Sequence, residues 1–282
     1  MAVCTKCGSE VADADDRCST CFADAGFPNV RAAFGPMETT ALEVRYSAAL
    51  DDARVRGADK SLAKFDDSMR KTAAVINVDL RFLFYFLSND KNLYSTYRLG
   101  VRAQTRKVAS EANDLHRTGV EAVLFGSYGE QLRYAALSLD GIGLKSYGDY
   151  TIRLRDIAVS DRASLLEENS YRFVERHDLR PGKGIPRGYR AVWADRHRLA
   201  VAKLAARISD YTPESTYAGL LLMNASKRDD DDFIEIHIYG PIDSNAIESV
   251  MGKSKLKKRT EHALAAASAE YLSKMGKTWI EA

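Results

Sequence analysis

The sequence predicts an α+β protein with a small zinc ribbon at its N-terminus, and three observations lead to this fold class. All four cysteines lie within the first 21 residues. Helical apolar spacing dominates up to about residue 124, and strand-like alternation beside amphipathic helices follows it. We therefore expect a zinc ribbon over 1–24, a helical region over 25–124, and an α+β domain over 125–282. The sheet of that domain is expected to be mixed or antiparallel and flanked by helices.

The cysteines form two C-x2-C pairs, CTKC and CSTC, separated by ten residues: Cys4, Cys7, Cys18 and Cys21. Each such turn aims two thiolates at one point, so the two turns together predict a tetrahedral Zn²⁺ site. The polar residues between the pairs cannot build a core, so the metal would supply the folding energy, on the order of 10 kcal/mol. Because all four ligands come from the protein, the predicted site is structural. The alternative is a redox or chance cluster of cysteines.

This segment resembles the short zinc ribbons fused to many bacterial and archaeal proteins. Ribbons of that kind bind nucleic acid, bind protein, or cap a neighbouring domain. The segment is acidic, since Lys6 and Arg17 are outnumbered by five carboxylates between residues 10 and 24. Its charge therefore argues against the ribbon itself being a nucleic-acid contact.

Charge and hydropathy narrow the function classes. The 282 residues carry a formal net charge of +2, so any polyanion-binding surface must be local. No segment approaches the roughly 20 apolar residues that cross a bilayer, and the N-terminus lacks a signal-peptide pattern. No cysteine remains for disulfides outside the ribbon. We therefore expect a cytoplasmic protein without a membrane interaction.

The order of elements follows from periodicity and from turn residues. The expected helices cover 38–74 with a break at Gly57, a segment starting at Asp79, roughly 93–124, 190–208, a short capped piece in 243–251, and an Ala-rich segment ending near 275. The expected strands are a brief extension at 75–78, the segments LRYAALSL, DYTIRLRDI and YRFVE within 131–175, and the segments 217–224 and 233–240.

The segment FIEIHIYG at 233–240 alternates strictly, which predicts a strand with two different faces. One face consists of isoleucines and is expected to join the core. The other face places Glu235 and His237 between Phe233 and Tyr239. That face either meets water or holds Glu235 in place for chemistry.

Several short motifs of the second half occur in a characteristic order. Taken singly, each has an ordinary explanation as a surface charge, a turn or a cap. The pieces are Arg133-Tyr134-Ala135-Ala136-Leu137, Tyr147-Gly148, Arg162-Ala163-Ser164, Asn169-Ser170, and Glu235-Ile236-His237 with Gly240-Pro241. Together, over about 125–250, they resemble the ADP-ribosyltransferase superfamily in its bacterial toxin and uncharacterised branch.

The resemblance implies an ADP-ribosyltransferase-like domain that uses NAD as a substrate, with Glu235 as the catalytic residue. A carboxylate there would stabilise the positive charge that develops on the ribose when the nicotinamide bond breaks. The implied NAD-binding residues are Arg133 and Arg162 for phosphate or ribose, Tyr134 and Tyr147 for the ring pocket, Ser164 beside Arg162, and His237 toward the ribose or the acceptor. His237 stands where the superfamily more often has Gln or Glu. The superfamily's first-strand Arg or His has two candidates here, His116 and Arg98.

Two basic segments indicate possible contacts with RNA or DNA, which would serve as the acceptor of ADP-ribose or simply as a ligand. They contain Lys253, Lys255, Lys257, Lys258 and Arg259, and Arg180, Lys183, Arg187 and Arg190. The setting implied by the resemblance is a toxin or a phage-defence effector acting on nucleic acid or protein.

Two other functions remain open. One is a non-enzymatic zinc-ribbon protein that binds nucleic acid. The other is a protein–protein adaptor that docks a partner through the helical region. The sequence contains no P-loop, no G-x-G-x-x-G turn after a strand and no His-rich open metal site, which disfavours kinases, Rossmann dehydrogenases and metallohydrolases.

Overall fold

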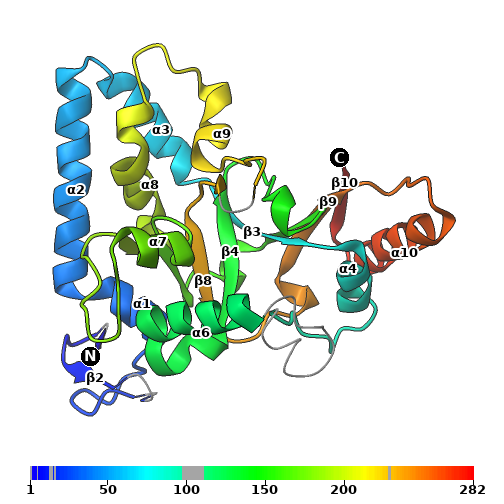
Figure 1. Ribbon diagram of the computed structural model, residues 1–282, viewed down its shortest axis with the longest axis horizontal. Helices are drawn as coiled ribbons and strands as arrows, with labels where there is room; N and C mark the ends of the chain where they lie inside the picture. Colours follow the sequence, from blue (N-terminus) through cyan, green and yellow to red (C-terminus); the bar gives the residue numbers. More distant parts are fainter. Residues whose placement is uncertain (1, 5, 13–14, 16, 97–110, 228–229) are drawn as a thin grey trace.

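A computed structural model describes the chain except for residues 1, 5, 13–14, 16, 97–110 and 228–229. Its centre is an eight-stranded sheet in the order β10-β9-β5-β3-β4-β8-β6-β7 (Figure 1). Neighbouring strands are antiparallel except for the parallel pair β9 and β10, so the sheet is mixed and the α+β prediction is confirmed. The strands are β3 (Ala73–Val78), β4 (Leu132–Ser138), β5 (Tyr150–Leu154), β6 (Ala163–Leu166), β7 (Arg190–Val192), β8 (Glu235–Tyr239), β9 (Ile247–Gly252) and β10 (Thr278–Glu281).

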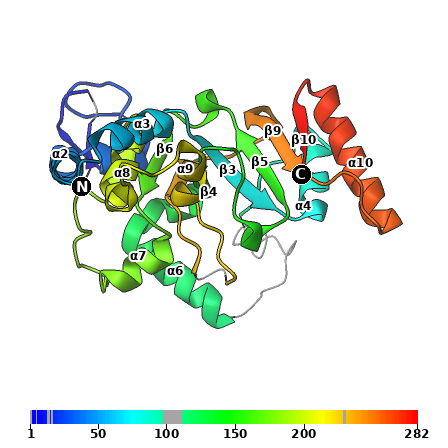
Figure 2. The same cartoon turned by 90° about the horizontal axis from the view of Figure 1, so that it is seen from above.

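Helices cover both faces of this sheet (Figures 1 and 2). The larger core lies on the face that carries Ile236 and Ile238 of β8. Its helices are α2 (Pro36–Val55), α3 (Asp59–Met69), α4 (Leu80–Leu87), α8 (Arg196–Leu204) and α10 (Arg259–Lys274). A second core lies on the opposite face, where α6 (Glu111–Phe125) and α7 (Ser170–Arg176) cover Leu132 and Leu166. Two short helices, α1 (Pro28–Phe34) and α9 (Tyr217–Leu221), complete the described helices.

Several predicted elements are confirmed. Helices α2 and α3 lie on either side of the break at Gly57 and account for 38–74 as far as Met69, after which β3 begins at Ala73. Asp79 caps α4 through its side chain, and α10 is the Ala-rich helix. Strands β4, β5 and β8 lie where alternation predicted them. Of the expected helix at 93–124, only the part from Glu111 onward is described as helix, and residues 97–110 lie outside the described residues.

Two predicted strands are wrong and two predicted helices are confirmed only in part, because capping and strand pairing outweighed the local pattern. The YRFVE segment lies in α7, since Asn169 accepts hydrogen bonds from the backbone N–H groups of Tyr171 and Arg172 and starts a helix there. Segment 217–224 begins with the short helix α9. Segment 190–208 opens with an edge strand, β7, before α8 begins. Only residues 244–246 of the expected helix at 243–251 form a helical turn, and β9 follows them.

Strand β3 has a larger role than the brief extension that was expected. It lies between β4 and β5, pairing Val75 with Ala136 and Ile76 with Ile152. The sheet is therefore assembled from segments on both sides of residue 124. Strand β3 carries neither Arg nor His.

The N-terminal ribbon is joined to α1 by one buried guanidinium. Arg31 is 1% exposed, and its side chain donates to the carbonyl oxygens of Ala12, Asp15 and Gly26. Burying a charged group is costly unless its hydrogen-bond donors have acceptors. Because Ala12 and Asp15 belong to the ribbon, Arg31 can hold the ribbon against α1 only while the ribbon is folded.

No helix within the described parts of the chain is both long enough and apolar enough to cross a membrane.

A buried polar cluster between α2, α3 and α8 makes the stability of the protein dependent on pH. Tyr46 donates to Asp66 over 2.9 Å, and the ring of His197 packs edge-on against Tyr46. Burial lowers the pKa of His197 below its usual value of about 6.5, and the neighbouring Asp66 opposes this shift only in part. As the pH falls, His197 therefore takes up a proton in the unfolded chain before it does so in the folded chain. Neutral His197 favours the folded state above about pH 6.5, and this contribution to stability is lost as the pH falls below that value.

We expect the melting temperature to be lower at pH 5.0 than at pH 7.5, and the fall to be smaller in His197→Gln. The difference between the two proteins isolates His197 from other groups, such as Glu168, whose pKa burial raises and which acts in the opposite direction. Thermal melts monitored by circular dichroism measure both curves. Parallel curves for wild type and variant would show that His197 does not carry the effect.

Candidate functional site

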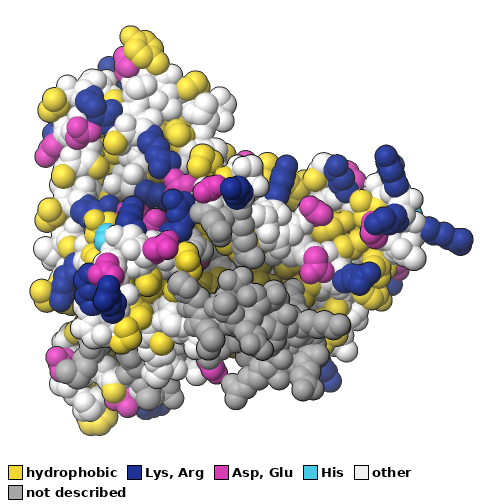
Figure 3. All heavy atoms as spheres, in the orientation of Figure 1, with side chains coloured by type: hydrophobic (Ala, Val, Ile, Leu, Met, Phe, Trp, Pro, Cys, Tyr) yellow, Lys and Arg dark blue, Asp and Glu magenta, His cyan; other side chains and the backbone are white. Residues whose placement is uncertain are grey.

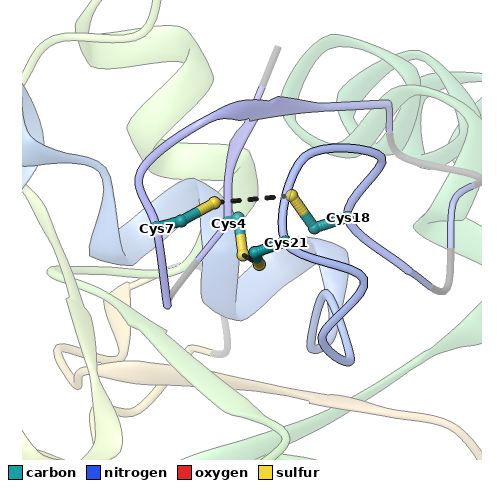
Figure 4. Close-up of side chains that lie close together, drawn as sticks. All are labelled: Cys4, Cys7, Cys18 and Cys21. Atoms are coloured by element: carbon teal, nitrogen blue, oxygen red, sulfur yellow. Dashed lines mark hydrogen bonds between the residues drawn. The ribbon is translucent and has the colours of Figure 1, made fainter.

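The four cysteines gather at one point in the ribbon, as Figure 4 shows. Their sulfur atoms all lie within 4.8 Å of one another. The Sγ atoms of Cys4 and Cys21 are 3.8 Å apart, and those of Cys7 and Cys18 are 3.5 Å apart. Four thiolates at Zn–S distances of about 2.3 Å in a tetrahedron are separated by about 3.8 Å. The group therefore fits a metal ion, and these separations are too long for disulfide bonds.

Two matching turns build this group. The N–H of Gly8 donates to the Cys4 carbonyl, and the N–H of Phe22 donates to the Cys18 carbonyl, each over 2.9 Å. Both turn residues have positive φ, 73° at Gly8 and 57° at Phe22. Hydrogen bonds with Ser9 lower the pKa of Cys7 to about 6, which favours the thiolate form of this exposed side chain. Thiolate is the form that binds metal.

The second face of β8 is closed to water. Glu235 is 5% exposed and His237 is 2% exposed. Residues directly opposite in a strand pair share a face, so Tyr134 of β4 and Ser164 of β6 flank His237. Helix α6 covers this face, with Phe125 packed edge-on against the His237 ring at a centroid distance of 4.6 Å. Both polar side chains are therefore enclosed, and this face does not simply meet water.

The Glu235 carboxylate is held by donors from the start of α7 and from its own strand. Its Oε1 accepts from the hydroxyl of Ser170, from the Ser170 N–H at 3.3 Å and from His237 Nε2 at 2.8 Å. Its Oε2 accepts from Asn169 Nδ2 at 3.1 Å. The bonds on Oε1 are buried, whereas the Asn169 bond is partly exposed. Oε2 accepts one described hydrogen bond whereas Oε1 accepts three, so Oε2 is the oxygen with lone-pair capacity left among its described contacts.

A second carboxylate lies above this face. Glu121 of α6 is 6% exposed and accepts from the Tyr134 hydroxyl at 3.2 Å. Sequence reasoning missed Glu121 because its segment shows only helical periodicity. The contact fixes the Tyr134 ring, which lies 5.5 Å from the His237 ring.

The two arginines expected to bind NAD lie apart from the Glu235 carboxylate. Arg133 pairs with Ile238, on the opposite sheet face, and its side chain donates to the carbonyls of Glu130 and Leu132. Arg162 donates to three carbonyls, those of Ala158, Tyr239 and Pro241, and so holds the end of β8. Burial lowers the pKa of both guanidiniums. The described contacts of Arg162 are therefore structural.

Ser164 lies on the Glu235 face, next to a residue that the sequence did not single out. Asn29 of α1 is 2% exposed, and its Nδ2 lies within hydrogen-bonding distance of the Ser164 hydroxyl and of the carbonyls of Arg162 and His237. This amide connects α1 to β6 and β8 beneath the ribbon. An isolated asparagine in a Pro-rich connector offers no sequence signal for such a role.

Tyr147 lies on the same sheet face, beyond Phe233, with its ring centroid 6.4 Å from that of Phe233. The turn before it is tied to the beginning of the β8 segment. Ser146 donates to Asp231 Oδ2, and Arg172 of α7 donates to the Asp231 carbonyl at 3.2 Å. Sequence reasoning also missed Arg172, a charged side chain of α7 that lies beside Asp231.

A hollow of about 180 Å³ opens further along the sheet, over β5, β9 and β10. Its lining includes Thr151, Arg153, Glu248 and Ser249. None of its lining residues contacts Glu235 through a described hydrogen bond. The hollow is therefore separate from the Glu235 cluster.

The two basic segments lie near opposite ends of the strand order. The segment with Lys253, Lys255, Lys257, Lys258 and Arg259 follows β9 and is exposed, at the right of Figures 1 and 3. In the other basic segment, at residues 180–190, more of the basic side chains are paired within the chain. Arg190 pairs with Glu38 at 3.1 Å, Arg180 pairs with Asp178 at 3.0 Å, and Lys183 donates to two carbonyls.

Of the remaining candidates, His116 falls within helix α6, and Arg98 lies outside the described residues. No protein-family model matches this sequence, and no curated protein matches it either. The structure itself thus defines an α+β protein that combines a group of four cysteines able to bind a metal ion with a buried cluster of Glu235, His237 and Ser170.

Proposed function

We propose that this chain transfers ADP-ribose from NAD to a macromolecular acceptor, with Glu235 as the catalytic residue. The observation that carries the proposal is the contact of Asn169 and Ser170 with the Glu235 carboxylate. The Asn-Ser pair belongs to the same motif set as Glu235, yet it lies 65 residues away in sequence. Support also comes from the sheet, where the Arg133-Tyr134, Ala163-Ser164 and Glu235-His237 pieces occupy three adjacent strands.

The chemistry follows from the position of the carboxylate. Four hydrogen-bond donors, from the start of α7 and from β8, fix its orientation. In the proposed reaction the bond between the ribose C1′ and nicotinamide breaks, and nicotinamide leaves with the electron pair. The acceptor nucleophile then bonds C1′ and releases its proton. Glu235 Oε2, which has lone-pair capacity left, would accept a hydrogen bond from a ribose hydroxyl and stabilise the cationic ribose.

Tyr134 and Tyr147 are proposed to line the nicotinamide side, since both lie on the Glu235 face. His237 would act by holding Glu235, to which it is hydrogen bonded. Arg172 suits the diphosphate better than Arg162, because Arg172 donates to one carbonyl among its described contacts whereas Arg162 donates to three.

We further propose that the four cysteines of the ribbon together hold a structural zinc ion. The sulfur separations, the two matched turns and the all-thiolate donor set support this metal. Its role would be to keep the ribbon folded, and thereby to keep Arg31 and α1 in place.

The proposed activity is tested by incubating the zinc-loaded protein with NAD labelled in the adenylate phosphate. Separate reactions contain total RNA, DNA, cell lysate or no addition. We expect label to enter one acceptor fraction while nicotinamide is released in equal amount. Nuclease and protease digestion of the labelled fraction identify the acceptor class. Neither NAD turnover nor NAD binding under any of these conditions would contradict the proposal and favour the binding or adaptor alternatives.

A further inference from the structure

Helix α1 is tied to the N-terminal ribbon on one side and to the sheet on the other. Toward the ribbon, Arg31 donates to the backbone carbonyls of Ala12 and Asp15. Toward the sheet, Asn29 is 2% exposed, and its Nδ2 atom reaches acceptors in β8 and at the start of β6. The two side chains belong to the same helical turn. A movement of α1 that follows the ribbon therefore moves the sheet contacts as well.

The contacts of Asn29 meet at the residue that holds the Glu235 carboxylate. Its Nδ2 atom lies 2.9 Å from the carbonyl oxygen of His237 and 3.2 Å from the hydroxyl of Ser164. Ser164 and His237 are direct partners in the pairing of β6 with β8. The Nε2 atom of His237 lies 2.8 Å from Oε1 of Glu235. Only His237 stands between the Asn29 amide and the carboxylate that we propose to act on NAD.

A second contact from the same segment reaches β8 two residues further along. Phe27, which immediately precedes the first turn of α1, packs against Tyr239 with the ring centroids 5.3 Å apart. Side chains two positions apart in a strand share a face, so Tyr239 and His237 lie on the same side of β8. The α1 segment therefore holds this strand at two successive positions of the face that carries Glu235.

The Asn29 amide is oriented for its donors. Its Oδ1 atom is buried and has no hydrogen-bond partner among the described residues. Turning the amide would bring Oδ1 against three oxygen acceptors, so the orientation is fixed. A buried acceptor without a partner costs stability, and such a group calls for a reason beyond packing. What the N–H groups hold on β6 and β8 supplies that reason.

We propose that Asn29 is a positioning residue of the Glu235 site, and that through α1 it makes the geometry of this site depend on the metal-bound ribbon. With the ribbon folded, Arg31 keeps α1 in place, and Asn29 fixes the backbone at His237. Without the metal, the ribbon carbonyls that hold Arg31 are lost, and α1 can shift. A displacement of about 1 Å at a catalytic group can cost about 100-fold in rate. The inference rests on the zinc site and the transferase activity proposed above.

The ring signal of His237 reports the coupling without any enzymatic readout. The full chain is labelled with ¹⁵N-histidine and loaded with zinc, and the His237 signal is identified by its absence in His237→Gln. We expect removal of zinc by a chelator to shift this signal and to leave that of His262, an exposed residue of α10, unchanged. In Asn29→Ala the His237 signal should be shifted while zinc is still bound, and chelation should move it no further.

Two outcomes of this experiment would overturn the coupling. One is a wild-type His237 signal that stays in place although chelation has made the ribbon sensitive to protease. The other is an Asn29→Ala protein whose His237 signal matches that of wild type, both with and without zinc. Chelation of wild type needs no substitution, so it decides the coupling even where Asn29→Ala does not fold.

Kinetic measurements test the positioning role. Asn29→Ala should lower kcat about ten-fold or more while the dissociation constant of NAD changes little, because the carboxylate is displaced and the substrate contacts remain. Phe34→Ala is the matched control, since it shortens an exposed side chain of the same helix. Equal losses in the two variants would overturn the positioning role. A wild type that turns over no NAD would contradict the proposed function, and the His237 signal would still decide whether Asn29 positions this site.

Discussion

Replacing Cys18 by serine is expected to remove the bound zinc and unfold the ribbon while the main core stays folded. The ribbon has a small core of its own, formed by Cys4, Val11, Cys18 and Ala25, and it cannot offset the entropy of ordering the segment without metal. Metal binding in comparable sites contributes on the order of 10 kcal/mol, which is the term that the substitution removes. The larger hydrophobic core shares no residue with this cluster.

Zinc content by elemental analysis and limited trypsin digestion measure the effect. Wild type should carry one zinc per chain and resist cleavage after the exposed Arg17, whereas Cys18→Ser should be cleaved there at least ten-fold faster. Treatment of wild type with a chelator should reproduce the variant. Ser19→Ala, an exposed change in the same turn, is the control. Full zinc content in Cys18→Ser, or unchanged protease resistance after chelation, would argue against a structural zinc site.

The second large effect is expected from Glu235→Gln, which should lower the turnover of NAD by about 10²–10³-fold while NAD still binds. The change removes the charge opposite the cationic ribose and keeps the side-chain shape. It has a structural cost as well, because the new amide N–H₂ would meet the Asn169 amide. Asn169 cannot turn to accept, since its oxygen caps α7. This bond is partly exposed, so its loss should cost less than the about 1–3 kcal/mol of a fully buried unsatisfied donor.

Separate measurements of kcat, NAD affinity and melting temperature distinguish catalysis from structure. Glu38→Gln is the matched control, because Glu38 is an equally buried carboxylate that accepts from Gly188 and Arg190 rather than from residues of the proposed NAD site. A drop in melting temperature with turnover unchanged would assign Glu235 a structural role only. Ser170→Ala, which removes one donor to Oε1, should reduce turnover less than Glu235→Gln does.

The sequence by itself determined the features that depend on neighbouring residues. The C-x2-C spacing places thiols in pairs, the alternation of FIEIHIYG predicts β8, and the Asp79 cap marks the start of α4. These patterns are local, because a turn or a period of two or 3.6 residues is set within a few residues of the chain. The same locality explains the errors, since α7 and β9 depend on a cap and on strand pairing that outweighed the local pattern.

Only the tertiary structure decided what surrounds the Glu235 carboxylate. Alternation placed Glu235 and His237 on one face, but the cover by α6 and the donors of Asn169 and Ser170 come from distant segments. The role of Arg162 was decided in the same way, by three carbonyls that fold into reach of its guanidinium. Burial and hydrogen bonding depend on how elements pack in space. The local sequence around one residue does not specify which distant segment will cover it.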